Sequence, residues 1–175
     1  MATTQYLRYL GRGLRTQGPP VHLTLFVTGR CNLRCRHCFH WKDVAAGTDG
    51  PSLEEVRSLA DSSARMGPLL WVALAGGEPF LRGDLPEIAA AFGRHGVQHL
   101  SIPTNGLVGE RQHEAVERML SLCPKTHINV AVSIDGPPKV HDNIRQVEGG
   151  HARALRAAER FREQAQRNEP PRRTT

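Results

Sequence analysis

The chain has 175 residues and a formal net charge of +6, and 39% of its residues are hydrophobic. This length accommodates one domain with a sizeable core and excludes two full domains. No apolar run approaches the ~20 residues that a membrane helix needs, and no secretory signal is recognisable, so we expect no membrane partner. Four cysteines without an export signal indicate a reducing compartment, and we therefore predict a cytoplasmic location.

Part of the positive charge lies near the two ends of the chain. We divide the sequence into a basic amino-terminal segment (1–20), one α/β domain (21–167) and a polar, proline-containing tail (168–175) that we predict to be disordered. The basic balance permits nucleic-acid binding. Acidic residues interrupt the basic run near the carboxyl end, which favours a solvated helix face, so nucleic acid is not the favoured partner.

Short apolar segments alternate with helical segments along the domain. The predicted strands are 21–28, 69–75, 97–103 and 127–134, and the predicted helices are 52–67, 84–96, 110–122 and 150–167. Ser52 and Glu55 form a capping-box pattern at the start of the first helix. This alternation is typical of βαβ units and predicts a parallel sheet with helices packed on it.

The unusual motifs all follow the carboxyl ends of predicted strands. Three cysteines follow the first strand, GGEP (76–79) the second, TNG (104–106) the third and DG (135–136) the fourth. In a doubly wound sheet the ligand lies at one switch point, which four consecutive loops would not all reach. A barrel collects such loops at one mouth. We therefore predict a partial (βα) barrel of the TIM-barrel type with about four βα units and outer helices.

The cysteines Cys31, Cys35 and Cys38 form one tight triplet. A disulfide framework needs an even number of cysteines, and a structural zinc site needs four ligands, usually in two separated pairs. Three thiolates suit a cubane iron–sulfur cluster, because they hold three irons and leave the fourth open. A Cys3His zinc site with His37 or His40, or buried structural thiols, are the alternatives.

The pattern Cys-x3-Cys-x2-Cys, with aromatic His37 before the last cysteine, resembles the signature of the radical S-adenosylmethionine (radical SAM) superfamily. The segments GGEP (76–79), TNG (104–106), SIDG (133–136) and HDNIR (141–145) match, in order, motifs of its peptide-modifying, SPASM-type branch. The resemblance covers roughly residues 21 to 160.

The resemblance implies two cofactors: a [4Fe-4S] cluster bound by Cys31, Cys35 and Cys38, and S-adenosylmethionine bound to the open iron. It implies an enzyme that cleaves S-adenosylmethionine reductively to a 5′-deoxyadenosyl radical, which abstracts hydrogen from a substrate. A peptide or protein substrate and an external electron donor are expected by analogy to the branch. The alternatives are a non-catalytic metal- or cluster-binding fragment and an RNA-modifying member of the superfamily.

The resemblance also implies the contacts to S-adenosylmethionine, which are His37, Gly76, Gly77, Glu78, Ser133, Asp135 and Arg145. Without Cβ atoms, Gly76 and Gly77 allow the backbone to approach a ligand closely. Glu78 is expected to pair with the methionine ammonium group, and His37 to lie where the adenine ring packs. A plain glycine turn is the alternative interpretation of this segment.

Ser133 and Asp135 occupy positions where the family has polar contacts to the ribose hydroxyls or the methionine carboxylate. Arg145 can pair with a carboxylate bidentately. A surface ion pair between Arg145 and Asp142 is the alternative for that arginine.

For other residues near the motifs, an ordinary structural role is the alternative to a role in the site. Phe39 and Trp41 are expected either to cover the cluster or to pack in the core. Thr104 and Asn105 form a turn in which Asn bonds its own backbone, or they lie at the mouth of the barrel. Cys123 is interpreted as a small apolar residue without a ligand role.

The superfamily core commonly has six βα units, and four are recognisable here. We expect a chain truncated from a longer enzyme, or a barrel that a partner completes. The fourth strand would then lie at an open sheet edge, which permits self-association.

Overall fold

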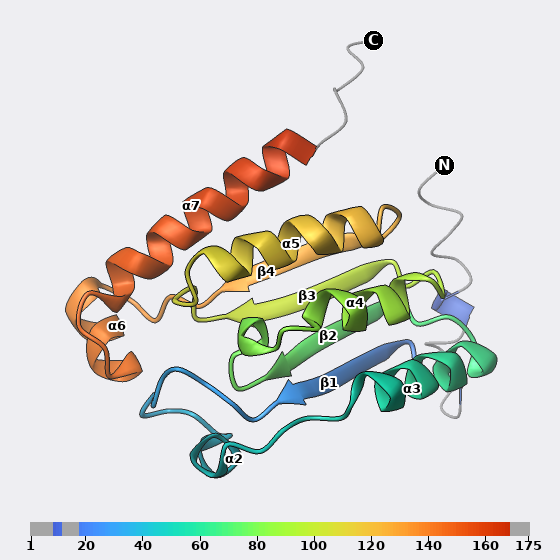
Figure 1. Cartoon of the computed structure of the whole chain (residues 1–175), viewed down its shortest axis with the longest axis horizontal. Coiled ribbons are helices and arrows are strands. Elements are labelled where there is room, and N and C mark those ends of the chain that lie inside the picture. The colour runs from blue at the N-terminus through green and yellow to red at the C-terminus, as the bar shows by residue number, and fades with distance from the viewer. Residues whose placement is uncertain (1–8, 12–17, 169–175) are drawn as a thin grey trace.

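The computed structural model describes residues 9–11 and 18–168 (Figure 1). Its centre is a four-stranded parallel sheet with the order β1-β2-β3-β4. The strands are β1 (His22–Thr28), β2 (Trp71–Gly76), β3 (His99–Thr104) and β4 (His127–Val132). Because the order in space is the order in sequence, the sheet does not reverse direction at a switch point. The prediction of a partial barrel wall is confirmed.

Helices connect the strands and follow the last of them. They are α2 (Trp41–Ala46), α3 (Leu53–Met66), the 3-10 helix η1 (Pro79–Leu81), α4 (Leu85–Gly93), α5 (Glu110–Leu122), α6 (Pro138–Arg145) and α7 (Gly150–Asn168). The sequence predicted the long helices. It missed α2, η1 and α6, which have six, three and eight residues and are too short for a clear periodic pattern.

Local sequence signals mark the start of α3 and the end of α4. At α3, the Ser52 side chain accepts the backbone N–H of Glu55, and the Glu55 carboxylate accepts that of Ser52, so the predicted capping box is confirmed. At α4, the helix ends at Gly93, three residues before the predicted boundary, and the chain turns through Gly96 with a positive φ of 75°. A residue in the left-handed conformation cannot continue an α-helix, and glycine adopts this conformation without strain.

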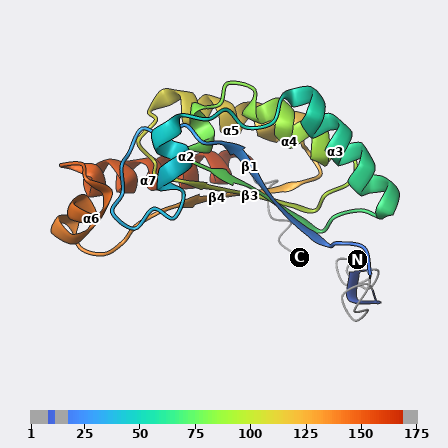
Figure 2. The ribbon, with the colours of Figure 1, turned by 90° about the horizontal axis from the view of Figure 1, so that it is seen from below.

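The sheet buries one face under α3, α4 and α5, which Figure 2 shows in one layer. Alternate strand residues Val72, Leu74, Leu100 and Ile102 are fully buried in the main hydrophobic cluster with side chains of these helices. Successive side chains of a strand point to opposite faces. The residues between them, such as Ala73 and Ser101, are less buried, as expected for the inner face of an incomplete barrel wall.

The helix α7 packs over β4 and α5 on the covered face of the sheet. Phe161 of α7 lies 6.1 Å from the ring of Phe80 and 4.4 Å from that of His113. The buried Gln164 side chain bonds both to the His113 ring and to its carbonyl oxygen. Strand β4 remains an edge of the sheet, and its predicted self-association stays a prediction.

The predicted terminal segments fall largely outside the described residues. Residues 1–8 and 12–17 of the basic segment and 169–175 of the tail are not described. Among the helices that the structure does describe, none combines the length and the apolar character needed to cross a membrane.

Candidate functional site

The predicted motifs meet around one cavity of about 400 Å³ at the carboxyl end of the strands. Every predicted cofactor or metal residue except Asp135 lines it: Cys31, Cys35, His37, Cys38, Gly76, Gly77, Glu78, Ser133 and Arg145. Asp135 is not among the residues that line the cavity, and it pairs with Arg145. Residues as far apart in the sequence as Cys31 and Arg145 therefore share one pocket, as the barrel topology predicts.

The cysteine loop supplies three free, partly buried thiols. Cys31 Sγ accepts the backbone N–H of Leu33 at 3.4 Å, and the N–H of Cys38 bonds the carbonyl oxygen of Cys35 at 3.2 Å. Burial raises the pKa of Cys31, and the nearby Glu78 and cysteine thiols act in the same direction. A thiol with a raised pKa keeps its proton until a metal displaces it, because metal binding requires the thiolate.

The donor set around the cavity fits an iron–sulfur cluster. Among the described residues, no group of three or more His, Cys, Asp or Glu side chains converges on a point that could hold one metal ion. A cluster does not require such convergence, because each thiolate binds a different iron. Of the two histidines considered as zinc ligands, His40 bonds Asp43 at 2.9 Å through Nδ1.

The helix α6 connects the cysteine loop to the turn after β4. The backbone N–H of Arg36 donates to the carbonyl oxygen of Ile144 at 2.9 Å. Arg145 donates two hydrogen bonds to Asp135, at 2.5 and 2.9 Å, and its Nη1 lies 3.9 Å from Cys35 Sγ. The guanidinium group lowers the pKa of Asp135. The ion pair therefore holds Arg145 against the cavity.

The alternative pairing of Arg145 with Asp142 is wrong. Asp142 instead accepts the backbone N–H groups of Gly149 and His151 at 2.7 and 2.8 Å, at the start of α7. The first N–H groups of a helix have no partner within the helix, and a short acidic side chain can accept their hydrogen bonds. Asp142 is used in this way and does not pair with Arg145.

The two glycines of the GGEP turn permit close approach to the protein's own backbone. A Cβ atom at Gly76 would lie less than 3.0 Å from the carbonyl oxygen of Thr28, and one at Gly77 less than 3.0 Å from that of Arg30. The Gly77 N–H donates to Thr28 at 2.7 Å, and the Glu78 N–H donates to Arg30 at 2.8 Å. The turn is thus joined directly to the start of the cysteine loop.

Glu78 is buried, with 1% of its surface exposed, and its carboxylate accepts hydrogen bonds from three donors. The hydroxyl of Thr104 donates at 2.9 Å, and the backbone N–H groups of Asn105 and Phe80 donate at 2.8 and 3.2 Å. Burial raises the pKa of Glu78, while these hydrogen bonds act to lower it. The carboxylate is therefore fixed in one orientation at the floor of the cavity.

Thr104 and Asn105 are the site residues that sequence reasoning undervalued. Asn105 Nδ2 donates to Asn32 of the cysteine loop at 2.7 Å, and its Oδ1 accepts the N–H of Leu107 as the predicted turn requires. Both residues are buried and line the cavity. They join the loop after β3 to both the GGEP turn and the cysteine loop. A turn-like TNG segment gives no local signal of these partners.

Phe39 and Trp41 do not pack in the core. Phe39 is 85% exposed and Trp41 is 60% exposed. Phe39 lines the mouth of the cavity, with its ring 4.7 Å from that of His40. The core-packing alternative is wrong, because Phe39, two residues before α2, and Trp41, the first residue of α2, both have exposed side chains.

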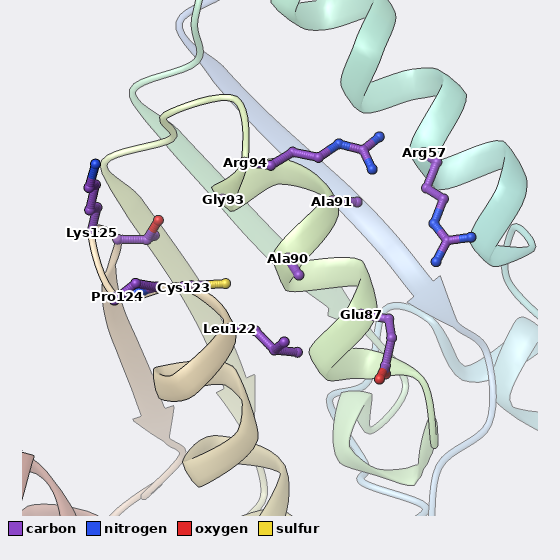
Figure 3. Close-up of a pocket in the computed structure, with 11 residues that line it drawn as sticks. Arg57, Glu87, Ala90, Ala91, Gly93, Arg94, Leu122, Cys123, Pro124 and Lys125 are labelled. Carbon is purple, nitrogen blue, oxygen red and sulfur yellow. The ribbon is translucent and has the colours of Figure 1, made fainter.

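A second cavity, of about 500 Å³, lies at the opposite end of the strands between α3, α4 and the turn before β4 (Figure 3). Its walls include Arg57, Glu87, Arg94, Lys125 and the buried Cys123, and none of the predicted site residues. Burial raises the pKa of Cys123, and its side chain belongs to the main hydrophobic cluster. This agrees with its interpretation as a small apolar residue.

Comparisons with known proteins identify the family. The model of the Radical SAM superfamily matches residues 25–169. Fe-coproporphyrin III synthase of Methanosarcina barkeri is 34% identical over 139 residues, which are 79% of this chain and 33% of that protein. PqqA peptide cyclase of Rhodopseudomonas palustris is 30% identical over 154 residues, which are 87% of this chain and 39% of that protein.

The fold is also found in solved structures. The crystal structure of Streptococcus suis SuiB bound to S-adenosylmethionine superposes with a TM-score of 0.68, at 19% identity, over 93% of this chain and 35% of that chain. Identity at this level shows the fold alone. From the family match, the chain belongs to the radical SAM superfamily. It spans about a third of the length of the curated relatives it matches.

Proposed function

We propose that this chain binds a [4Fe-4S] cluster through Cys31, Cys35 and Cys38 and holds S-adenosylmethionine in the adjoining cavity. The observation that carries the proposal is that three free thiols line one pocket together with residues of the GGEP, TNG and SIDG segments, in a chain that belongs to the radical SAM superfamily. Such a cluster would supply the one electron that breaks a C–S bond of S-adenosylmethionine, which gives methionine and a 5′-deoxyadenosyl radical that would abstract hydrogen from the substrate. We propose the cytoplasm as the location.

Different residues of the pocket suit different parts of S-adenosylmethionine. The oriented carboxylate of Glu78 suits the methionine ammonium group, because its three donors fix the orientation of the carboxylate before the ligand arrives. Arg145 and Ser133 suit the methionine carboxylate and the hydroxyl groups, and His37 offers a ring for the adenine. Gly76 and Gly77 let the turn pack directly against the backbone of Thr28 and Arg30, which keeps the Glu78 carboxylate next to the cysteine loop.

Asp135 has a supporting role in this proposal. Its carboxylate is occupied by the guanidinium of Arg145, and it does not line the cavity. We therefore assign it to holding Arg145 in place rather than to direct contact with the ribose. An ion pair of this kind, with side chains 12% and 20% exposed, keeps the arginine from folding back into solvent.

A peptide or protein is the substrate class that the relatives favour. One relative is named PqqA peptide cyclase, and SuiB has a crystal structure bound to a precursor peptide, SuiA, with a TM-score of 0.65 to this chain. Relatives named GTP 3′,8-cyclase have comparable identity, 35% over 118 residues in Erythrobacter litoralis. A nucleotide substrate is therefore the second candidate, and an external reductant is required in both cases.

The proposal is tested by anaerobic reconstitution with iron and sulfide, followed by reduction with dithionite in the presence of S-adenosylmethionine. Mass spectrometry measures 5′-deoxyadenosine. We expect product from the wild-type chain and from Cys123→Ala, which removes a thiol outside the loop, and none from Cys35→Ala. Zinc binding without cluster formation, or equal product from Cys35→Ala, would overturn the proposal. A cluster without product would indicate a cluster-binding chain that does not catalyse.

A further inference from the structure

His141, the first residue of the HDNIR segment, is buried beside the ion pair of Asp135 and Arg145. It lies on α6, which follows the carboxyl end of β4 (Figure 1). Its side chain is 1% exposed, and it does not line the cavity of the cysteine loop. Burial of a polar ring costs free energy unless its nitrogen atoms have partners, so the contacts of this ring are informative.

His141 and Arg145 hold Asp135 from the same face of α6. The two residues are one helical turn apart, so their side chains lie one above the other. The backbone N–H of Asp135 donates to Nδ1 of His141 at 3.3 Å, and its carboxylate accepts two hydrogen bonds from Arg145. Nδ1 also lies 3.6 Å from the carboxylate oxygen Oδ2. The helix therefore holds one residue of the preceding loop by both its main chain and its side chain.

The loop between β4 and α6 has backbone freedom that such a contact restrains. Ser133 is still joined to the sheet, because its N–H donates to the carbonyl oxygen of Thr104 at 2.9 Å. Ile134 is 41% exposed, and Gly136 has a positive φ of 135°, which glycine adopts more readily than other residues. The hydrogen bond between the Asp135 N–H and the His141 ring therefore fixes the main chain between these two residues.

The proton of the His141 ring lies on Nε2. Burial lowers the pKa of His141, which favours the neutral ring. Nδ1 accepts a hydrogen bond, and the buried Nε2 then carries the proton without a partner among the described residues. A histidine that binds a metal has the opposite arrangement, because its second nitrogen donates. The His151 ring, 5.6 Å away between centres, therefore does not form a metal site with His141.

We propose that His141 is a positioning residue for the binding of S-adenosylmethionine, an inference that rests on the proposed function. By holding the main chain of Asp135, it sets the position of the guanidinium group of Arg145, which lines the cavity and suits the methionine carboxylate. His141 does not line the cavity and acts through Arg145. A binding group keeps a productive geometry only when the residues behind it are themselves fixed.

Two substitutions separate the roles of the two ring nitrogen atoms. The side-chain oxygen of asparagine takes a place similar to that of Nδ1, whereas the end of glutamine reaches the place of Nε2. His141→Asn therefore keeps an acceptor for the Asp135 N–H, and His141→Gln moves it away. The matched control is His113→Gln, which changes a buried histidine of α5 that does not line the cavity. Thermal unfolding and the iron and sulfide contents of every form are measured first.

Isothermal titration calorimetry on the anaerobically reconstituted chain compares two ligands. S-adenosylmethionine carries the carboxylate, and decarboxylated S-adenosylmethionine lacks only this group. We expect His141→Gln to weaken the binding of S-adenosylmethionine about three- to tenfold, as the loss of one hydrogen bond implies, and that of the decarboxylated ligand less than about twofold. His141→Asn should recover most of the lost affinity, and His113→Gln should stay within about twofold of the wild type with both ligands.

Two further measurements show whether the effect passes through Arg145. In an Arg145→Lys background, His141→Gln should change the affinity for S-adenosylmethionine less than about twofold, because the pair that it positions is already lost. In the chain without cofactors, the NMR signal of the Arg145 Nε–H group, assigned with Arg145→Lys, reports hydrogen exchange. This exchange should be at least about fivefold faster in His141→Gln than in the wild type.

Equal affinities of the wild type and His141→Gln for S-adenosylmethionine would overturn the inference. So would an equal loss with both ligands, a loss in His141→Asn as large as that in His141→Gln, or losses that add in the Arg145→Lys background. If His141→Gln does not fold, His141→Ala, which also lacks the acceptor, takes its place in each comparison. A wild-type chain that forms no cluster, or whose cluster does not bind S-adenosylmethionine, would instead refute the proposed function. The exchange rate of the Arg145 Nε–H group would then still show whether His141 positions that arginine.

Discussion

Replacing Thr104 by Val tests whether the hydroxyl at this position holds the buried Glu78. The hydroxyl donates to Glu78 Oε1 at 2.9 Å and accepts the backbone N–H of Gly106 at 3.0 Å. Valine has a similar shape but removes both hydrogen bonds. Glu78 and Thr104 are 1% and 3% exposed, so water cannot replace the lost partners without rearrangement.

The expected cost follows from the two lost interactions. A hydrogen bond to a charged group contributes about 1.5–3 kcal/mol, and a buried N–H without a partner costs about 1–3 kcal/mol. Val is also slightly more apolar than Thr, which offsets part of this cost. We expect Thr104→Val to lower the free energy of unfolding by about 2–4 kcal/mol. Thr104→Ser keeps the hydroxyl and loses one methyl group, and should cost about 1 kcal/mol.

Urea unfolding of the chain without cofactors, followed by circular dichroism, gives both free energies of unfolding. Both variants are measured at pH 7. If their free energies of unfolding fall with urea concentration at the same slope, the values extrapolated to water can be compared directly. If Thr104→Val and Thr104→Ser are equally stable within about 0.5 kcal/mol, the hydroxyl does not hold Glu78, and the account of the cavity floor is wrong.

Three further predictions concern the same site. The folded-state pKa of Glu78 is raised above its unfolded value, so the contribution of this group to stability is largest at low pH and declines as the pH rises through the folded pKa. We therefore expect the free energy of unfolding of the wild type to fall relative to that of Glu78→Gln as the pH is raised from 4. Urea unfolding of both chains measures this difference. Gly77→Ala should destabilise the chain by about 2–3 kcal/mol, because its Cβ would meet cysteine-loop backbone, whereas Gly83→Ala, with open space around it, should change thermal unfolding little. Arg145→Lys, which loses the two-pronged pair with Asp135, should weaken S-adenosylmethionine binding to the reconstituted chain about tenfold by isothermal titration calorimetry.

The strands, their order and the long helices were predictable from the sequence. Each apolar segment was followed by a helix long enough to cross back over the sheet, and such right-handed crossovers place consecutive parallel strands side by side. The carboxyl ends of the strands then fall at one edge, which brought the cysteines, Glu78 and Ser133 to one cavity. Topology therefore predicted that these motifs meet at one edge of the sheet, whereas the roles of the residues came from the resemblance to the superfamily and stay predictions.

The pairings inside the site were not predictable in the same way. Thr104 and Asn105 bond a carboxylate that lies 26 and 27 positions earlier in the chain, and no local pattern encodes such a contact. Likewise, Arg145 has three acidic residues within ten positions, namely Asp135, Asp142 and Glu148. Asp135 was selected because the start of α7 occupies Asp142, and the position of a helix start depends on packing.

The exposure of Phe39 and Trp41 was also beyond sequence reasoning. Their hydrophobicity predicts burial on average, whereas both side chains are exposed at the end of the cysteine loop and the start of the short helix α2. Exceptions of this kind, in which a side chain contradicts its own preference, are expected at surfaces that serve a function.

The central claim is that three cysteines hold a cluster whose open iron binds S-adenosylmethionine. The most direct measurement is the electron paramagnetic resonance spectrum of the anaerobically reconstituted, dithionite-reduced chain, recorded with and without S-adenosylmethionine. We predict a reduced [4Fe-4S] signal from the wild-type chain that changes on addition of S-adenosylmethionine, and no such signal from Cys35→Ala. A signal that S-adenosylmethionine leaves unchanged, or one that persists in Cys35→Ala, would contradict the claim.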